Sequence, residues 1–362
     1  HDVRFSVRRD LTVEGCRDAQ DLVDRTRREL ELGHTVIIDE FQRLPDSVLE
    51  DIAQVHPAGR LILCGSSMGV VNQVLSRSSP MLGLLTPFRL DLIRPTDVLN
   101  ALSKQYDART SIELGTFARD PWLIPLLGDT LVGTLGVMVR YTKLSVPGLV
   151  GEVFAEEDRK MTMMYDSMLR LIGSGTWDTK KMSSLLYSRG AIDQPGSHRV
   201  SAYVSNLEQM GLVESVPLLG GRSRYLRLRS AIMMLHYYLD DRYAITEREF
   251  STEEVMPTVE VLVSKEIENF IVDLLSEAHG LGKAKRLEDE IDGVLTRRNK
   301  IVEVVEVKWK PFEKADAENF LEKTRDLPGE KMLVCAQGGG TRHGEITVLG
   351  PEQLIDLARG RG

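Results

Sequence analysis

Acidic and basic side chains with a spacing suited to phosphate chemistry occur in the last third of the chain. Asp292 is followed fourteen residues later by Glu306-Val307-Lys308. Side chains alternate along a strand, so Glu306 and Lys308 are expected to project from one face while Val307 packs behind them. The two carboxylates would hold Mg²⁺ or Mn²⁺, with the Val307 carbonyl and water completing the oxygen ligands. A metal there lowers the pKa of an attacking water, and Lys308 would hold that nucleophile and offset negative charge on a phosphate.

A carboxylate from a preceding helix is predicted to join this set. After an acid-rich linker over 247–260, the amphipathic pattern Val263–Glu277 predicts a helix with Glu266 and Glu268 in its first turns. We expect Glu268 to supply a further ligand or a water contact, with Glu266 as its rival for that role. The hairpin that carries Asp292 is expected to end in the strand Ile301–Lys308. A Glu-x-Lys pair alone is also typical of a surface strand with cross-strand ion pairs.

A second acidic pair lies in the first third of the chain. Thr35–Ile38 is a β-branched run of the kind buried in a parallel sheet, and it ends in Asp39-Glu40. Asp39 would hold Mg²⁺ directly or through water, and Glu40 would orient a water for attack on a phosphate. Leu61–Cys64 is a second buried run, which brings Ser66 to the same edge of the sheet. The alternative is an ordinary strand followed by a helix N-terminus that favours acids.

The stretch Thr35–Pro95 resembles a family of P-loop ATPases, the archaeal-type members of the STAND/AAA+ group. The resemblance rests on the segments VIIDEFQRLP, LILCGSS and PFRLDLIRP, in that order and spacing. It implies a parallel nucleotide-binding sheet that takes ATP and Mg²⁺. It further implies that Asp39 and Ser66 contact the bound nucleotide, with Ser66 sensing its γ-phosphate, and that Glu40 acts in hydrolysis.

The sequence departs from this family in two places. Gly83 is followed by Leu84, where many relatives carry an arginine. No G-x-x-x-x-G-K-[ST] segment occurs, and this is the loop whose backbone N–H groups and lysine cradle the phosphates. We expect a first short strand at Val3–Val7. In the family the loop precedes that strand, so we expect it upstream of His1. The chain as given is expected to bind ATP poorly.

The middle of the chain is predicted to be helical with one hairpin. Two amphipathic patterns, Thr96–Tyr106 and Ile112–Leu127, resemble the small helical lid of the same ATPase group. Three further helices and a Gly-tipped hairpin then predict a winged helix-turn-helix. Its elements are Met161–Ile172, Thr179–Ser188, His198–Met210, Leu212–Val216 and Arg222–Leu228.

Positive charge gathers in this middle region of an otherwise acidic chain. Residues 160–230 hold ten Lys and Arg against five acids, a net of +5, whereas the whole chain has a net charge of −8. Arg199 falls at the start of the predicted recognition helix, and Arg222 and Arg224 fall on the wing. Contacts from these arginines would be mainly to DNA phosphates. The alternative is that the winged helix serves only as a joint between proteins.

The stretch Val263–Gln337 resembles the PD-(D/E)XK nuclease-like domain at the C-terminus of archaeal ATPases. That pattern, F-E, then E-I-D, then E-V-K-W, is matched by Ile267-Glu268, Glu290-Ile291-Asp292 and Glu306-Val307-Lys308-Trp309. The resemblance implies a restriction-endonuclease-like α/β domain. Domains of this kind also persist as binding modules, so activity does not follow from the fold.

Length and composition indicate the general class of protein. A chain of 362 residues with 28% charged and 42% hydrophobic residues is typical of a folded multidomain protein. Three cysteines without a C-x-x-C exclude a disulfide framework and a zinc ribbon, and no apolar run reaches the length of a membrane span. We therefore expect a cytoplasmic protein with no membrane partner.

The predicted fold class is multidomain, α/β plus α+β. We expect a truncated P-loop sheet over 1–95, a helical lid over 96–155, a winged helix over 156–246 and the nuclease-like domain over 247–362. The predicted function is an ATP-binding and ATP-hydrolysing, DNA-handling protein whose ATPase module regulates the winged helix and a metal-dependent deoxyribonuclease. One alternative is an ATP-dependent switch or scaffold without nuclease activity, with a nucleotide-dependent homo-oligomer or a protein partner. The other is a DNA-binding regulator whose nuclease-like domain is inert.

Overall fold

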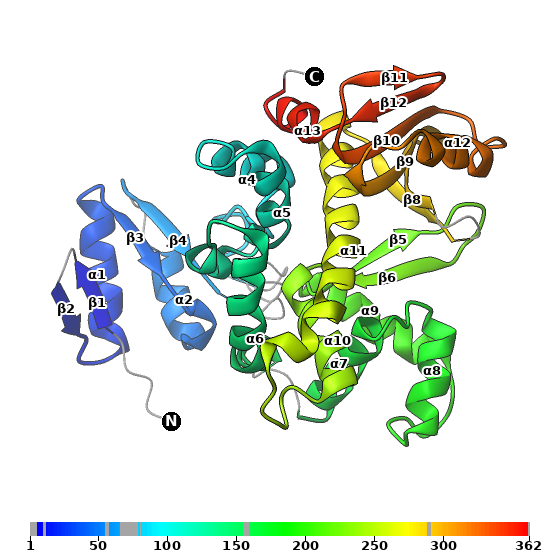
Figure 1. Ribbon diagram of the computed structural model, residues 1–362. Helices are drawn as coiled ribbons and strands as arrows, with labels where there is room; N and C mark the ends of the chain where they lie inside the picture. The colour runs from blue at the N-terminus through cyan, green and yellow to red at the C-terminus, as the bar shows by residue number, and fades with distance from the viewer. Residues whose placement is uncertain are drawn as a thin grey trace. The chain divides into compact units, whose positions relative to one another are not determined.

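The computed structural model describes residues 6–9, 12–54, 58–65, 79, 81–154, 159–287 and 291–360 (Figure 1). The chain divides into two compact units, His1–Leu90 and Asp91–Gly362. The structure is mixed α/β, with a short parallel sheet in the first unit and helical regions around a larger sheet in the second. No helix within the described ranges is long and apolar enough to cross a membrane.

The first unit contains two small sheets and two helices. The strands β1 (Ser6–Arg9) and β2 (Thr12–Gly15) are antiparallel, whereas β3 (Thr35–Ile38) and β4 (Arg60–Leu63) are parallel. Helix α1 (Ala19–Glu31) begins where the Asp18 carboxylate accepts a hydrogen bond from the Asp21 N–H at 2.8 Å, a typical N-cap. Helix α2 (Asp46–Ala53) follows a short 3-10 turn, Phe41–Arg43. The apolar side chains that these elements share are Val23, Ile38, Phe41, Val48, Leu49, Ile52 and Met81.

The sequence predicts that β3 and β4 are buried on both faces, and the structure corrects this. Ile38 is buried, but Ile37 is 63% exposed and Ile62, its partner on β4, is 45% exposed. Successive side chains of a strand point to opposite faces. In the described part of this unit, α1 and α2 pack on one face of the β3–β4 pair, which leaves the other face open.

The second unit starts with helices that the sequence assigns to a lid. They are α4 (Pro95–Leu102), α5 (Ala108–Ala118), the 3-10 helix η2 (Pro121–Leu126) and α6 (Leu131–Phe154). The expected helix over 112–127 is interrupted, because Pro121 lacks the N–H that a continuing α-helix needs. It also begins earlier than expected, because the Asp107 carboxylate caps it by accepting from the Thr110 N–H at 3.0 Å.

The next elements have the predicted order of three helices and a hairpin. Helices α7 (Arg159–Gly173), α8 (Thr179–Ser188) and α9 (Ser197–Gln209) precede the antiparallel strands β5 (Val213–Pro217) and β6 (Arg224–Leu228), and α10 (Ala231–Tyr243) follows. A Cβ at Gly173 would lie 2.4 Å from the Tyr237 Cβ, so α7 and α10 approach closely only because this residue is glycine. Apolar side chains from all six elements form one cluster.

A six-stranded mixed sheet forms the C-terminal part of the second unit. The spatial order is β11-β12-β10-β9-β8-β7, in which β10 is parallel to β9 and to β12 and the remaining pairs are antiparallel. Its strands are β7 (Gly282–Arg286), β8 (Ile291–Arg297), β9 (Lys300–Pro311), β10 (Glu330–Gln337), β11 (Thr341–His343) and β12 (Ile346–Leu349). Arg298 and Asn299 turn the chain between β8 and β9, and both have positive φ, as in tight hairpin turns.

Helices cover both faces of this sheet (Figure 1). Helix α11 (Thr252–His279) and helix α13 (Pro351–Ala358) pack on one face with Val305 and Val307, and helix α12 (Lys314–Lys323) packs on the other with Val304. Glu306 has the same parity as Val304 and therefore lies on the α12 face.

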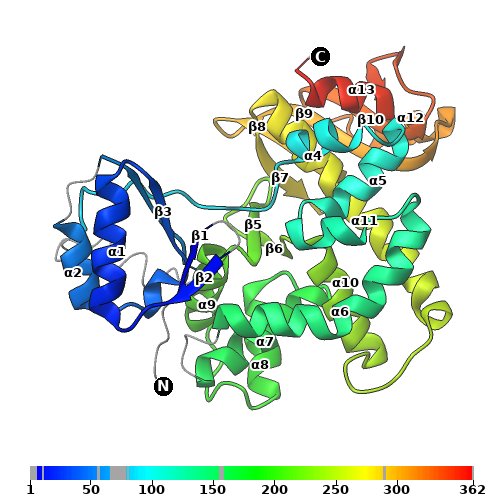
Figure 2. The same ribbon diagram turned by 90° about the vertical axis from the view of Figure 1, so that its left-hand side faces the viewer.

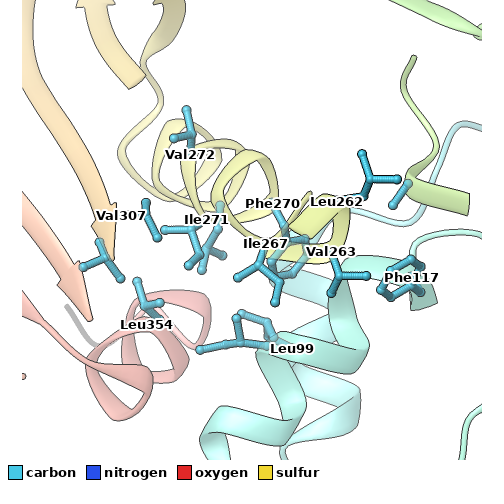
Figure 3. Packing of buried hydrophobic residues seen from close by; sticks show 14 of the residues in the cluster. Leu99, Phe117, Leu262, Val263, Ile267, Phe270, Ile271, Val272, Val307 and Leu354 are labelled. Carbon is cyan, nitrogen blue, oxygen red and sulfur yellow. The ribbon is translucent and has the colours of Figure 1, made fainter. Parts of the chain in front are cut away.

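Helix α11 is longer than predicted. Residues 252–260 of the expected linker belong to it, because the Ser251 hydroxyl accepts a hydrogen bond from the Glu254 N–H and caps the helix there. It shares a core with α4 and α5, so the helices predicted as a lid pack against the helix that carries Glu268. Figure 3 shows Leu99 of α4 next to Ile267 and Phe270, and Phe117 of α5 next to Val263.

Candidate functional site

Asp292 lies where β8 and β9 stop pairing. The last backbone pair there is Gly293 with Val305, and beyond it Asp292 Oδ2 accepts a hydrogen bond from the Val307 N–H at 2.9 Å. The carboxylate thus takes the place of a backbone acceptor in the ladder. Only 9% of the Asp292 side chain is exposed. The structure therefore brings together Asp292 and Val307, two of the predicted site residues.

Glu268 comes to this carboxylate from α11. Lys265 Nζ lies 2.5 Å from Glu268 Oε2 and 3.4 Å from Asp292 Oδ1, so one ammonium group bridges the two acids. Burial, and then the negative charge of Asp292, raise the pKa of Glu268. Its predicted rival, Glu266, is buried elsewhere and accepts a hydrogen bond from the Asn269 amide. Among the two glutamates, Glu268 is the one beside Asp292.

Glu306 and Lys308 form the neighbouring half of the site on β9. The Lys308 Nζ lies 2.7 Å from Glu306 Oε1. Burial opposes the charged form of Lys308, but the hydrogen bond that Lys308 donates to Glu306 and the charges of Glu306, Asp292 and Glu268 outweigh it and raise the pKa of Lys308. This ammonium group therefore pairs with Glu306 and is also within range of the charges of Asp292 and Glu268.

One oxygen of Glu306 is buried without a partner. Glu306 is 2% exposed, and its Oε2 finds no hydrogen bond among the described residues. A buried carboxylate oxygen without a donor is costly, so a cation at this position would relieve that cost. Carboxylate and carbonyl oxygens are also the donors that Mg²⁺ and Mn²⁺ prefer. The residue types here fit such an ion, although no described group of three or more His, Cys, Asp or Glu side chains is preassembled to hold one.

Helix α12 contributes a lysine that the sequence analysis missed. Lys323 Nζ lies 3.4 Å from Glu306 Oε1, and a hollow of about 670 Å³ opens beside these groups. The hollow is lined by Arg286, Glu306, Lys308, Asp316, Asn319, Phe320, Glu322, Lys323 and Asp326. Phe320 and Lys323 stand three residues apart on one helix face, a spacing that could have indicated that Lys323 faces the sheet.

A second missed lysine comes from β7. Lys285 Nζ donates to the Asp292 carbonyl oxygen at 3.2 Å. Burial, together with the nearby charge of Lys265, lowers the pKa of Lys285 to about 8. Lys265, Lys285 and Lys308 thus surround Asp292 with positive charge. Such a setting suits a ligand that carries negative charge, such as a phosphodiester.

The acidic pair of the first unit lies at the end of β3. Asp39 is exposed and its Oδ1 accepts from the Glu40 N–H at 3.0 Å. Glu40 has a φ of 53°, and its Oε2 lies 3.1 Å from Arg43 Nε. Strands β3 and β4 end side by side, since the Cys64 N–H donates to the Ile38 carbonyl at 2.8 Å. Ser66 lies outside the described residues.

The three arginines predicted to contact DNA are exposed. Arg199 lies in the first turn of α9, Arg222 in the turn of the β5–β6 hairpin, and Arg224 at the start of β6. The Arg224 guanidinium donates to the Ser215 carbonyl at 2.7 Å across the hairpin. Arg227, by contrast, is committed to ion pairs in the interior and is not available to DNA.

No family model and no curated protein matches this sequence. A matching solved structure is that of the Orc1 protein of Aeropyrum pernix in complex with DNA. It has 17% sequence identity and a TM-score of 0.25, and the match covers 63% of this chain and 69% of that chain. A TM-score this low does not establish a shared arrangement.

Proposed function

We propose that this chain belongs to an ATP-regulated, DNA-handling protein whose C-terminal domain hydrolyses phosphodiesters with a divalent metal. One observation supports this above the others. Asp292 and Glu268 share Lys265 where β8 and β9 part, and Lys308, which pairs with Glu306 on β9, is affected by the charges of both acids. Glu306 also keeps a buried carboxylate oxygen with no donor among the described residues. The exposed arginines of α9 and of the hairpin would hold the DNA backbone, and the acidic pair after β3 would belong to the ATP site.

The chain's own residues define the chemistry. Asp292, Glu306 and the Val307 carbonyl would hold Mg²⁺ or Mn²⁺, which supplies a Lewis acid and a lowered water pKa when bound. Hydrolysis joins the oxygen of one water to phosphorus and breaks the bond from phosphorus to one sugar oxygen. Glu268, with its raised pKa, would take the proton that the water loses, and the leaving oxygen would gain one from solvent. Lys308 would donate a hydrogen bond to the developing negative charge on the phosphate.

Cleavage assays test the proposal. The full-length protein is incubated with plasmid and with single-stranded DNA in Mg²⁺ or Mn²⁺, with and without ATP. We expect D292A to lose metal-dependent cleavage and K308A to lose about 10²–10³-fold, the usual effect of removing one such donor. E318Q is the matched control, because Glu318 is an exposed acid of α12. Cleavage that persists in D292A, or in EDTA, would overturn the assignment.

A second candidate function is binding of nucleic acid without cleavage. It is favoured by the lysines that neutralise the acids, since Lys265 bridges Glu268 and Asp292 and both Lys308 and Lys323 approach Glu306. Under this alternative the wild-type protein binds DNA, cuts under no metal condition, and still hydrolyses ATP. The same assay, run beside a binding measurement, separates the two functions.

A further inference from the structure

The β5–β6 hairpin is docked on the edge of the six-stranded sheet. The Leu219 N–H, at the end of the hairpin, donates to the Lys285 carbonyl of β7 at 2.9 Å, and Leu218 forms a parallel bridge with the same residue. Figure 2 shows the hairpin next to β7. A wing that contacts DNA on its own would leave its tip in solvent. Here the tip extends the sheet that carries Asp292.

Buried ion pairs hold the hairpin in this place. Arg227 of β6 lies 2.7 Å from Asp273 of α11, and Lys283 of β7 lies 2.5 Å from both Asp273 and Glu214 of β5. Arg119 adds a third cation at 2.8 Å from Asp273. Burial disfavours the charged form of Asp273, but Arg227 and Lys283 outweigh it and hold its pKa below the usual range. The hairpin is therefore fixed relative to the sheet and to α11.

Tyr225 of the hairpin and its neighbour Trp177 form two aromatic rings near Lys285, which contacts Asp292. Trp177, which precedes α8, and Tyr225 of β6 form an aromatic pair with ring centroids 5.8 Å apart and planes tilted by 30°. Both side chains are half-buried. Lys285 Nζ lies 5.6 Å from the Tyr225 ring centroid and 3.2 Å from the Asp292 carbonyl. Contacts thus run without a break from the aromatic pair to Asp292.

This juxtaposition suits one class of ligand. Aromatic rings bind the faces of nucleic-acid bases, and lysines bind the phosphates between them. A base in a duplex has its faces covered by its neighbours, so only an unpaired base can stack on a side chain. Lys265 and Lys285 lie on the side of Asp292 toward the aromatic pair, where the phosphate of such a nucleotide would be held.

We infer that Trp177 and Tyr225 form a stacking platform for an unpaired base next to the scissile phosphate, so that the substrate class is a single strand or a frayed end. Lys265 and Lys285 hold the phosphate of the stacked nucleotide, and the hairpin positions it. The position of the scissile phosphate in this inference rests on the proposed function. The preference for unpaired bases rests on the aromatic pair alone.

Binding in EDTA tests the platform without cleavage. A fluorescein-labelled 20-mer of thymidylate is titrated with the full-length protein, and a blunt duplex of equal length is titrated in parallel. We expect Y225L to bind the single strand about tenfold more weakly, the usual cost of losing one stacked base, and Y225F to restore binding. Y187L is the matched control, because Tyr187 is an exposed tyrosine of α8. Single-strand affinity unchanged in Y225L, or a duplex loss of equal size, would overturn the inference.

Tryptophan fluorescence gives an independent readout. The chain has three tryptophans, so the quench that an added single strand produces must become smaller in W177F if the base stacks there. A quench of unchanged size in W177F contradicts the platform. An oligoribonucleotide of matching sequence distinguishes RNA from DNA as the source of the unpaired base.

The two proposals fail in different ways. If the wild type cuts and D292A does not, but Y225L cuts single strands as fast as the wild type, the nuclease stands and the platform falls. If no condition gives cleavage while Y225L still weakens single-strand binding, the platform stands and the nuclease falls.

Discussion

At the scale of single residues, the site depends on where each charge finds its partner. Asp292 accepts hydrogen bonds from a backbone N–H and from an ammonium group, whereas only one of the two Glu306 carboxylate oxygens has a partner in the part of the chain that the structure describes. Among the described residues, the Glu306 side chain therefore has a free carboxylate oxygen that could bind a cation. In the first unit Glu40 is held by Arg43, close to Asp39 and at the end of the parallel pair.

A prediction at this scale concerns Glu40. If Glu40 orients the water for ATP hydrolysis, E40Q in the full-length protein will slow ATP turnover by about 10²–10⁴-fold and leave ATP binding intact, because the amide keeps the shape and loses the charge. Steady-state phosphate release and a nucleotide-binding titration measure the two quantities. E50Q, at a glutamate in α2, serves as control. Turnover unchanged in E40Q would remove this residue from hydrolysis.

Spacing along the sequence predicts much of the C-terminal site. Glu306 and Lys308 share a face because of strand alternation, and the Asp292 hairpin closes on them through a two-residue turn. Lys285 and Lys323 could not be placed in the same way, since they reach the site only through the pairing of β7 and the packing of α12. Spacing along the sequence predicts which side chains meet within one hairpin. Side chains from other elements reach the site only through tertiary packing, which the spacing does not show.

At the scale of elements, the predicted helices and strands are present, but their surroundings differ from expectation. Strand β3 has one open face in the described part of its unit, because a β-branched run indicates a strand without showing how many layers cover it. The start of α11 at Thr252 was missed, since an acid-rich stretch resembles a linker as much as the first turns of a capped helix. The hairpin was predicted as the wing of a winged helix, and its contacts with Asp273, which fix it to α11, could not be predicted from its sequence.

The fixed hairpin gives a prediction on stability. D273N leaves Arg227, Lys283 and Arg119 around a neutral side chain in the interior, and we expect a loss of about 3–5 kcal/mol in the free energy of unfolding. Urea denaturation followed by circular dichroism measures it. D326N removes an exposed partner of Arg286 and should change stability by less than about 1 kcal/mol. A similar small change in D273N would show that the hairpin is held by other contacts.

The same ion pairs predict a pH dependence. The pKa of Asp273 is lower in the folded chain than in the unfolded one, so its stabilisation is complete above the unfolded value of about 4. It is lost as the pH falls through the lower, folded value. Acid unfolding of D273N should therefore lack this contribution when it is compared with the wild type over the same pH range.

At the scale of the whole molecule, the chain is acidic but its arginines are not spread evenly. Residues 160–230 carry a net charge of +5 within a total of −8, and Arg199, Arg222 and Arg224 remain at the surface. A local field of this kind attracts phosphates even when the net charge of the protein is negative. DNA binding by this region should therefore depend strongly on salt.

Charge reversal tests that expectation. We expect R199E with R222E to weaken DNA binding and to flatten the slope of log affinity against log salt, because fewer counterions are released on binding. Affinity is measured at several salt concentrations. K181E with R189E, at two exposed basic residues of the same region, controls for the change in net charge. Equal slopes in the double variant and the wild type would leave this region as a joint between proteins.

The two-residue turn at Arg298-Asn299 also bears on how the protein folds. It joins β8 to β9, so Asp292 and Lys308 meet after a loop of only a few residues closes. Short loops close at low entropic cost and their contacts form early. By contrast, Lys323 reaches Glu306 only once α12 has packed on the sheet. During synthesis, β8 and β9 would therefore pair in register before the last strands of the sheet leave the ribosome.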